Sequence, residues 1–197
     1  MTELKQLDES ISALVIVDVQ PTFCEGGALP VQGGNSVAKK IRLLLESNHG
    51  YELVVTTQDW HINPGTHFSD NPNYVDTWPE HGRAGSVEAE LHCELENLGH
   101  CNAHRVKKGM YNAAFSGFEG VDEFQIPLNE TLKSKGVTHV DIVGLAFDYC
   151  VKSTAIDSVN YGYKTRVLTR FSAAVHPENK STITKEIKAA GVEVVES

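Results

Sequence analysis

The chain has 197 residues, 41% of them hydrophobic, and a formal net charge of −9. This length suits a single domain, residues 1–197, with one sizeable core. Because the basic residues form no block in this acidic chain, a nucleic-acid surface is excluded and a small-molecule partner is expected.

No apolar run has the length of a membrane span, and the N-terminal MTELKQLDESIS is polar and acidic, unlike a secretory signal. We therefore expect a cytoplasmic protein that binds no membrane. An acidic domain of this size could be a monomer or a homo-oligomer. The cysteines lack CxxC spacing and should be free thiols in a reducing compartment: Cys24, Cys93, Cys101 and Cys150.

Apolar runs and helical patterns alternate along the chain. The runs show little internal alternation, which is typical of strands buried on both faces. They cover residues 13–17, 53–57, 140–143, 165–168 and 192–195. Helical spacing covers residues 36–47, 121–135, 150–160 and 177–190. This alternation predicts an α/β fold, a three-layer α/β/α sandwich with a mostly parallel sheet.

Polar or reactive side chains follow three of the predicted strands. Asp18, Asp59 and Cys150 each lie shortly after an apolar run. Ligands of open parallel sheets bind beyond the carboxyl ends of the strands, near the point where the strand order reverses. These three side chains should therefore converge on one edge. The loop-like stretch 61–85 is long for a compact domain, which favours a functional role.

Asp18 directly follows the first apolar run, in LVIVDVQPTF. A carboxylate at a strand end is often only a cap or a partner for a helix. Within hydrogen-bond reach of a thiol, it could instead take the thiol proton and return it to a leaving amine. Asp18 is therefore a candidate general base and acid.

The stretch after the second run is rich in candidate metal ligands. Asp59 and His61 are two residues apart and point to the same side of an extended segment, and His81 could return from the loop to join them. One carboxylate and two imidazoles suit one divalent ion such as Zn, Fe or Mn. His67 could be a fourth ligand or a hydrogen-bond partner of the other histidines. The alternative is a group of solvated polar loop residues.

Lys108 lies in RVKKGMYNAAFSGFEG, before a glycine and among aromatic and small residues. Most lysines are exposed, so an ordinary surface lysine is the simpler interpretation. In a pocket, its charge could hold Asp18 ionised and Cys150 as a thiolate. We expect the neighbouring Lys107 to face outward.

Cys150 follows the apolar run HVDIVGL, where helical spacing begins. We expect this thiol in the first turn of a helix, where unpaired N–H groups and the helix dipole should lower its pKa. The simpler interpretation is a small buried hydrophobic residue.

Five segments together resemble the nicotinamidase/pyrazinamidase branch of the isochorismatase-like cysteine hydrolase superfamily. They are DVQPTFCEGGALPVQGG, TQDWHINPGTHFS, WPEHG followed by GSVEAELH, KKGMYNAAFSGFEG and VGLAFDYCVKSTAIDS. The segments occur in the order of the family from about residue 14 to residue 169.

The resemblance implies hydrolysis of nicotinamide, and of pyrazinamide, through a thioester on the cysteine. It leaves open whether the role is to recycle pyridine nucleotides or to clear amides. Its implied catalytic residues are Asp18, Lys108 and Cys150. Its implied metal ligands are Asp59, His61 and His81. It further implies a cis peptide bond between Leu145 and Ala146, an oxyanion hole from the N–H groups of Ala146 and Cys150, and a substrate ring held by Phe23 and Trp78.

The chain departs from this family pattern at two places. Gly82 and Arg83 stand where many members have Cys-Val, and Tyr149 stands where many have histidine. Phe147 and Tyr149 could narrow or reshape the rim of the pocket, which leaves the relative activity on different amides open.

Three other interpretations stay open from the residues alone. The chain could be a related amidase for carbamoyl or ureido compounds, although those relatives generally lack the metal residues. It could be a non-catalytic binding or scaffold protein of the same fold. It could also be a redox or metal-handling protein in which Cys24 approaches Cys150.

Overall fold

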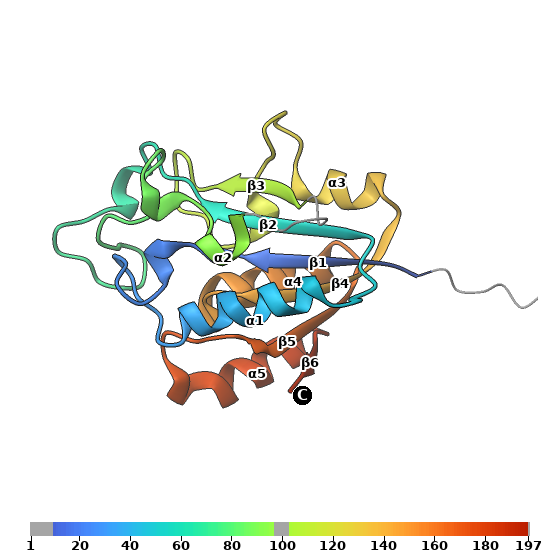
Figure 1. The fold of residues 1–197 in the computed structure, drawn as a ribbon. Helices are drawn as coiled ribbons and strands as arrows, with labels where there is room; N and C mark the ends of the chain where they lie inside the picture. The colour runs from blue at the N-terminus through green and yellow to red at the C-terminus, as the bar shows by residue number, and fades with distance from the viewer. Residues whose placement is uncertain (1–9, 97–102, 197) are drawn as a thin grey trace, which may run out of the picture.

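A six-stranded parallel sheet forms the centre of the computed structural model, which describes residues 10–96 and 103–196 (Figure 1). The strand order is β3-β2-β1-β4-β5-β6, with every pair parallel. The strands are β1 (Ile11–Val17), β2 (Leu53–Asp59), β3 (His104–Lys108), β4 (Val137–Gly144), β5 (Lys164–Ser172) and β6 (Glu193–Val195). The predicted sheet is therefore confirmed.

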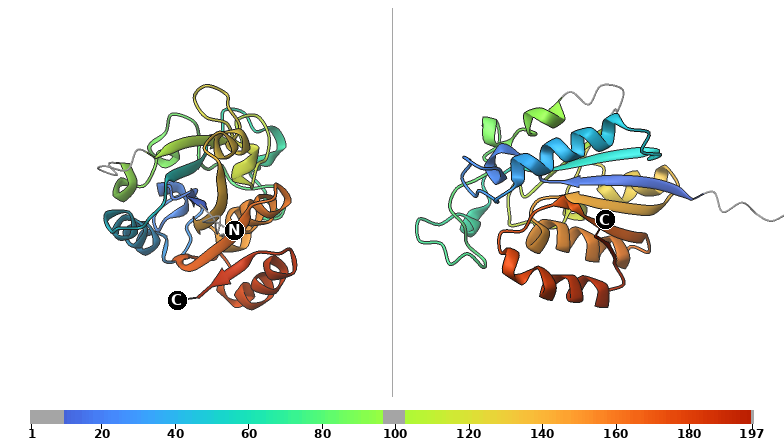
Figure 2. Two further views of the ribbon diagram at one scale, coloured as in Figure 1. Left: turned by 90° about the vertical axis from the view of Figure 1, so that its right-hand side faces the viewer. Right: turned by 60° about the horizontal axis from the view of Figure 1, so that its bottom comes forward.

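Helices cover both faces of the sheet. On one face, α1 (Gly34–Glu46) and α2 (Cys93–Glu96) pack on the apolar side chains of β1 and β2. On the other face lie α3 (Leu128–Ser134), α4 (Lys152–Asn160) and α5 (Lys180–Ala189). The right view of Figure 2 shows α1 on one side of the sheet and α4 and α5 on the other. The structure confirms the three-layer sandwich.

The central strands carry the apolar runs for a physical reason. In β1, residues 13–17 are buried without interruption, because side chains on both faces of this strand meet a helical layer. The strand order reverses between β1 and β4, since the chain builds β2 and β3 on one side of β1 and then crosses to the other. Ligand sites of parallel sheets lie at such a point.

Two sequence predictions were wrong in detail. The helix predicted over residues 121–135 covers only Leu128–Ser134, because Asp122 accepts the N–H of Ile126 in a turn and Pro127 is the extended N-cap residue before the helix. The edge strand β3 was not predicted, because HRVKK carries a single apolar residue and pairs with one neighbour only.

Within the described ranges, none of the helices combines the length and the apolar character needed to cross a bilayer.

Candidate active site and metal centre

Cys150 lies on the turn that follows β4. The turn is a π-helical segment, Phe147–Val151, in which the N–H of Val151 donates to the carbonyl of Ala146 at 3.1 Å. The peptide bond between Leu145 and Ala146 is cis, which confirms that prediction. Because α4 begins only at Lys152, Cys150 precedes the first α-helical turn in which it was predicted.

Lys108 brings the predicted catalytic residues together. Its ammonium lies 3.0 Å from Oδ2 of Asp18, 3.8 Å from the sulfur of Cys150, and in an ion pair with Oδ1 of Asp59. It also donates to the carbonyl of Ala114 at 3.0 Å. Lys108 is the last residue of β3, opposite Asp59 in the sheet register, and is only 1% exposed. The buried interpretation of this lysine is therefore correct.

The neighbouring Lys107 does not simply face outward as predicted. Its ammonium lies 3.2 Å from the centre of the Trp60 ring, a cation–π contact, and the side chain is half-buried.

The carboxylate of Asp18 is oriented by a threonine that sequence reasoning missed. Thr57 donates from its hydroxyl to Oδ1 of Asp18 at 2.6 Å, and its backbone carbonyl accepts the N–H of Asp18 at 3.2 Å. Asp18 itself has a φ of 48°, so the chain turns sharply as β1 ends. Threonine in a buried strand usually serves as a β-branched strand former, so no local signal marked this one.

Burial governs the protonation of the nucleophile and the base. It raises the pKa of the Cys150 thiol well above its ordinary value, because the loss of hydration outweighs the attraction of Lys108. The expected lowering of this pKa is therefore wrong. Burial also raises the pKa of Asp18, against the opposing effect of Lys108 and of the Thr57 hydrogen bond. The resting site thus favours a proton on this pair.

The other two charges in the site are firmly ionised. Burial acts against the charge of Lys108, but Asp18, Asp59 and Cys150 around it raise its pKa well above the ordinary value. Burial acts against the charge of Asp59 too, yet the ammonium of Lys108 holds its pKa well below the ordinary value. Lys108 and Asp59 therefore form a buried ion pair.

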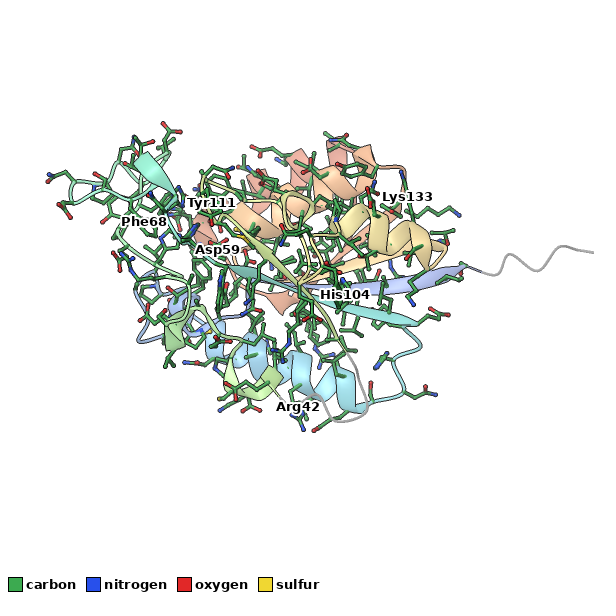
Figure 3. All side chains as sticks on the ribbon, turned by 90° about the horizontal axis from the view of Figure 1, so that it is seen from above. Arg42, Asp59, Phe68, His104, Tyr111 and Lys133 are labelled. Carbon is green, nitrogen blue, oxygen red and sulfur yellow. The ribbon has the colours of Figure 1, made fainter. Side chains whose placement is uncertain are left out.

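Three histidines converge beside Asp59. His61, His67 and His81 are buried, and one ring nitrogen of each lies within 4.8 Å of the other two. The Nε2 atoms of His61 and His81 lie 3.5 and 3.6 Å from Oδ2 of Asp59. Figure 3 places Asp59 toward the end of the molecule that carries Phe68, away from Lys133 in α3. Phe68 packs edge-on against His61 and His81 and closes this cluster with an apolar ring.

Backbone carbonyls decide which nitrogens face the cluster. Nδ1 of His61 bonds to the carbonyl of Gly109 at 2.6 Å, and Nδ1 of His81 to the carbonyl of Pro79 at 2.8 Å. A carbonyl can only accept, so each Nδ1 carries the proton and each Nε2 presents a lone pair. Hydrogen bonds of this kind commonly orient the histidine ligands of a metal.

These atoms fit a divalent metal ion. Nε2 of His61 and Nδ1 of His67 are buried and have no hydrogen-bond partner among the described residues. Burial lowers the pKa of His67 to about 4, so its imidazole is neutral and able to offer a lone pair. Acceptor nitrogens that face a carboxylate oxygen repel one another unless a cation lies between them. The nitrogen and oxygen donor set suits Zn, Fe or Mn.

A cavity of about 180 Å³ joins this cluster to the nucleophile. It is smaller than the roughly 300–1,000 Å³ of pockets for drug-sized ligands, so it suits a ligand of about one ring. Its lining includes the predicted Phe23, Trp78, Ala146 and Cys150, together with Asp59, His67 and His81. None of the described residues that line it is a lysine or an arginine. Apart from Asp59, Cys150 and the two histidines, the described lining is apolar or aromatic, which favours a ligand with a flat, largely apolar ring.

The aromatic wall of this cavity differs from the prediction. Tyr149 lines it, with its ring edge-on to Trp78 at 5.3 Å and stacked on Phe115 at 6.4 Å. Phe147 does not line it, because its side chain points into the core and is 2% exposed. Tyr74, Phe115 and Val175 were not predicted, since they lie in loops that only the folded chain brings to the cavity.

The described cysteines are all free, namely Cys24, Cys93 and Cys150, while Cys101 lies outside the described residues. Cys24 packs in the apolar cluster beneath α1, whereas Cys150 belongs to the cluster on the opposite face. The suggested approach of Cys24 to Cys150 does not occur, and the redox interpretation loses its support.

Known proteins resemble this chain over most of its length. Residues 12–197 match the family model of the isochorismatase domain. The nicotinamidase/pyrazinamidase of Mycobacterium tuberculosis is 44% identical over 183 residues, which cover 93% of this chain and 97% of the relative. The structure of PnC1 from L. infantum in complex with nicotinate is 31% identical, covers 95% of this chain and 93% of that chain, and superimposes with a TM-score of 0.81. The pyrazinamidase of Pyrococcus horikoshii in complex with zinc is 30% identical, covers 94% of this chain and 99% of that one, and has a TM-score of 0.80.

Proposed function

This chain belongs to the isochorismatase family, and we propose that it is a nicotinamidase that hydrolyses nicotinamide to nicotinate and ammonia, and pyrazinamide in the same way. One observation carries this proposal. A small cavity, lined mainly by apolar and aromatic side chains, has the thiol of Cys150 on one side and the histidine cluster on the other. A neutral heteroaromatic amide can present its carboxamide to the thiol and its ring nitrogen to the cluster at the same time.

In the proposed reaction, Asp18 takes the proton of Cys150 and the thiolate attacks the carboxamide carbon. The raised pKa of Asp18 makes it a stronger base than an ordinary aspartate. The N–H groups of Ala146 and Cys150 receive the negative charge that develops on the carbonyl oxygen. Asp18 then gives its proton to the leaving nitrogen, ammonia departs, and water cleaves the thioester to release the acid and the thiol.

Lys108 remains protonated through these steps. Its ammonium contacts both the sulfur of Cys150 and the carboxylate of Asp18, so it offsets the negative charge that passes between them. This buried charge therefore lowers the cost of forming a thiolate whose pKa burial has raised.

For the metal centre, we propose one divalent ion held by Asp59, His61 and His81, with His67 as a further nitrogen donor. When bound, such an ion supplies a positive charge to which a pyridine nitrogen can coordinate. The unpartnered nitrogens of His61 and His67 support this assignment, as does the zinc complex of the similar Pyrococcus pyrazinamidase. Phe23 and Trp78 line the cavity between the cluster and the thiol, where they would hold the ring.

The related activity on carbamoyl or ureido compounds is the second candidate. Relatives of that class generally lack the metal residues, whereas Asp59, His61 and His81 are all present here and lie close together. A non-catalytic scaffold is disfavoured because the proposed base Asp18, the proposed nucleophile Cys150 and Lys108 are all present, and Lys108 contacts both of the others.

The decisive experiment measures ammonia release from nicotinamide by the purified protein, before and after treatment with a chelator and after readdition of Zn²⁺, Mn²⁺ or Fe²⁺. We expect activity that the chelator removes and the metal restores. Release from a ureido acid with none from nicotinamide would favour the second candidate, and no release from any amide by the folded, metal-loaded protein would favour a scaffold.

A further inference from the structure

Gln20 forms a paired contact with the backbone of Asp59. The side-chain amide of Gln20 donates to the carbonyl of Asp59 at 3.0 Å, and its oxygen accepts the N–H of Asp59 at 2.9 Å. The same amide nitrogen also donates to the carbonyl of Ala89 at 2.8 Å. Gln20 is fully buried, so these bonds do not exchange with bulk water.

In this contact, Gln20 makes the hydrogen bonds to Asp59 that a neighbouring strand would otherwise make. The pairing of β1 with β2 ends at Ile16 and Thr56, because the left-handed turn at Asp18 carries the chain away from β2. The N–H and carbonyl of Asp59 both face the space that β1 leaves. The amide of Gln20 offers one donor and one acceptor in that space, which are the two bonds that a neighbouring strand would make.

Asp59 is held from its other side by β3. The N–H of Trp60 donates to the carbonyl of Lys108 at 2.9 Å, and Asp59 and Lys108 are register partners. The peptide of Asp59 is therefore fixed between β3 and Gln20. Its carboxylate has to satisfy two demands at once, since Oδ1 pairs with Lys108 and Oδ2 faces Nε2 of His61 and His81.

We propose that Gln20 is a positioning residue that aligns the Asp59 carboxylate for the metal centre. This inference rests on the proposed function, because it concerns the same metal ligands. Residues that orient metal ligands through hydrogen bonds typically contribute about 10- to 100-fold in metal affinity. Loss of the Gln20 amide should therefore weaken metal binding although Gln20 itself contacts no ligand atom.

The chain offers a matched control in Gln58. Its side-chain amide donates to the same carbonyl of Ala89, at 2.8 Å, and it is 1% exposed. The side-chain amide of Gln58 makes no described hydrogen bond to Asp59. Replacement of either glutamine by methionine keeps the length of the side chain and removes one donor to Ala89, but only the change at Gln20 releases Asp59.

The experiment measures the Zn²⁺ affinity of the full-length apo protein by competition with a chromophoric chelator, for wild type, Gln20→Met and Gln58→Met, with thermal melting of each. We expect a larger loss in Tm for Gln20→Met, because it leaves the buried N–H and carbonyl of Asp59 without their partner, and a Zn²⁺ affinity about 10- to 100-fold weaker for Gln20→Met alone. Affinities within twofold of each other for the two variants would overturn the proposal.

A second variant keeps the test decisive if Gln20→Met does not fold. Gln20→Glu retains the acceptor for the N–H of Asp59 and has at most one donor in place of two, so we expect an affinity between those of wild type and Gln20→Met. An affinity equal to that of wild type contradicts the proposal. The same measurements test the proposed metal centre separately from the role of Gln20. Wild-type protein that binds neither Zn²⁺, Mn²⁺ nor Fe²⁺ overturns the metal centre itself, whereas tight wild-type binding with unchanged variants overturns only the role of Gln20.

Discussion

The ammonium of Lys108 lies 3.8 Å from the sulfur of Cys150, although the two residues are 42 positions apart in the chain. Lys108 ends the edge strand β3, and Cys150 follows the more central strand β4. The side chain of Lys108 therefore reaches from one edge of the sheet to the point where the strand order reverses. This reach places one buried cation among the nucleophile, the base and the first candidate metal ligand.

Replacement of the nucleophile should abolish turnover and leave the fold intact. Cys150→Ala removes one sulfur from a buried turn, so we expect an ammonia-release rate at least about 10³-fold lower, with the metal content and Tm of the wild type. Ammonia release and metal analysis of the same preparation check this. Substantial residual activity would exclude Cys150 as the nucleophile.

Removal of the buried cation should affect stability as well as activity. Lys108→Met leaves the carboxylates of Asp18 and Asp59 buried without their counter-charge, which costs roughly 3–5 kcal/mol of the free energy of unfolding. Denaturant unfolding measures the loss. The double variant Lys108→Met with Asp59→Asn removes one of the two carboxylates that have lost their counter-charge, so it should be more stable than Lys108→Met alone. A double variant that is less stable would contradict the ion pair.

A methyl group at Gly109 should displace a histidine. A Cβ built on Gly109 would lie 2.6 Å from Cε1 of His61, and the φ of this glycine is +72°. Gly50 is the matched control, since its φ is +73° and a Cβ there meets no atom within 4 Å. Gly109→Ala and Gly50→Ala should therefore both show the backbone cost of about 1–2 kcal/mol. Only Gly109→Ala should lose metal affinity in the chelator competition, and equal affinities would show that His61 tolerates the shift.

The pH dependence of activity should respond to Thr57. Asp18 must be ionised to accept the thiol proton, so kcat/KM rises as the pH rises through the pKa of Asp18. The hydrogen bond from Thr57 lowers this pKa, acting with the Lys108 ammonium against burial and the charge of Asp59. Thr57→Val removes that bond, so we expect the acid limb of the kcat/KM profile to move to higher pH.

Thr56→Val serves as the control for this profile. The hydroxyl of Thr56 is buried and has no hydrogen-bond partner in the part of the chain that the structure describes, so its loss should leave the acid limb unchanged and cost little stability. An acid limb that moves equally in both variants would show that Thr57 does not tune Asp18.

The sheet itself was predictable because of how parallel strands are buried. A strand such as β1 meets helices on both faces, so its sequence is a continuous apolar run that can be recognised without knowledge of its neighbours. The edge strand β3 was not predicted, because a strand that pairs with one neighbour can have a sequence as polar as HRVKK and shows no apolar run. Its recognition depends on the β2 register, which brings Lys108 opposite Asp59.

In the candidate site too, local sequence identified the residues, whereas distant contacts decided their chemistry. Asp18, Asp59 and Cys150 were identifiable from the sequence because each follows an apolar run, and parallel strands bring their carboxyl ends to one edge. Their chemistry was only partly predictable. The expected lowering of the Cys150 pKa considered the local helix dipole, whereas burial by residues distant in the chain raises it.

From the sequence by itself follow the α/β architecture, the order of the reactive residues and the family resemblance, because these depend on local periodicity and on motifs read along the chain. Only the tertiary structure decided that Thr57 orients Asp18, that Gln20 pairs with Asp59, and that backbone carbonyls set the tautomers of His61 and His81. Thr57 and Gln20 each act on a residue 39 positions away. Hydrogen bonds over such separations depend on strand register and on turns, which no local pattern of residue types records.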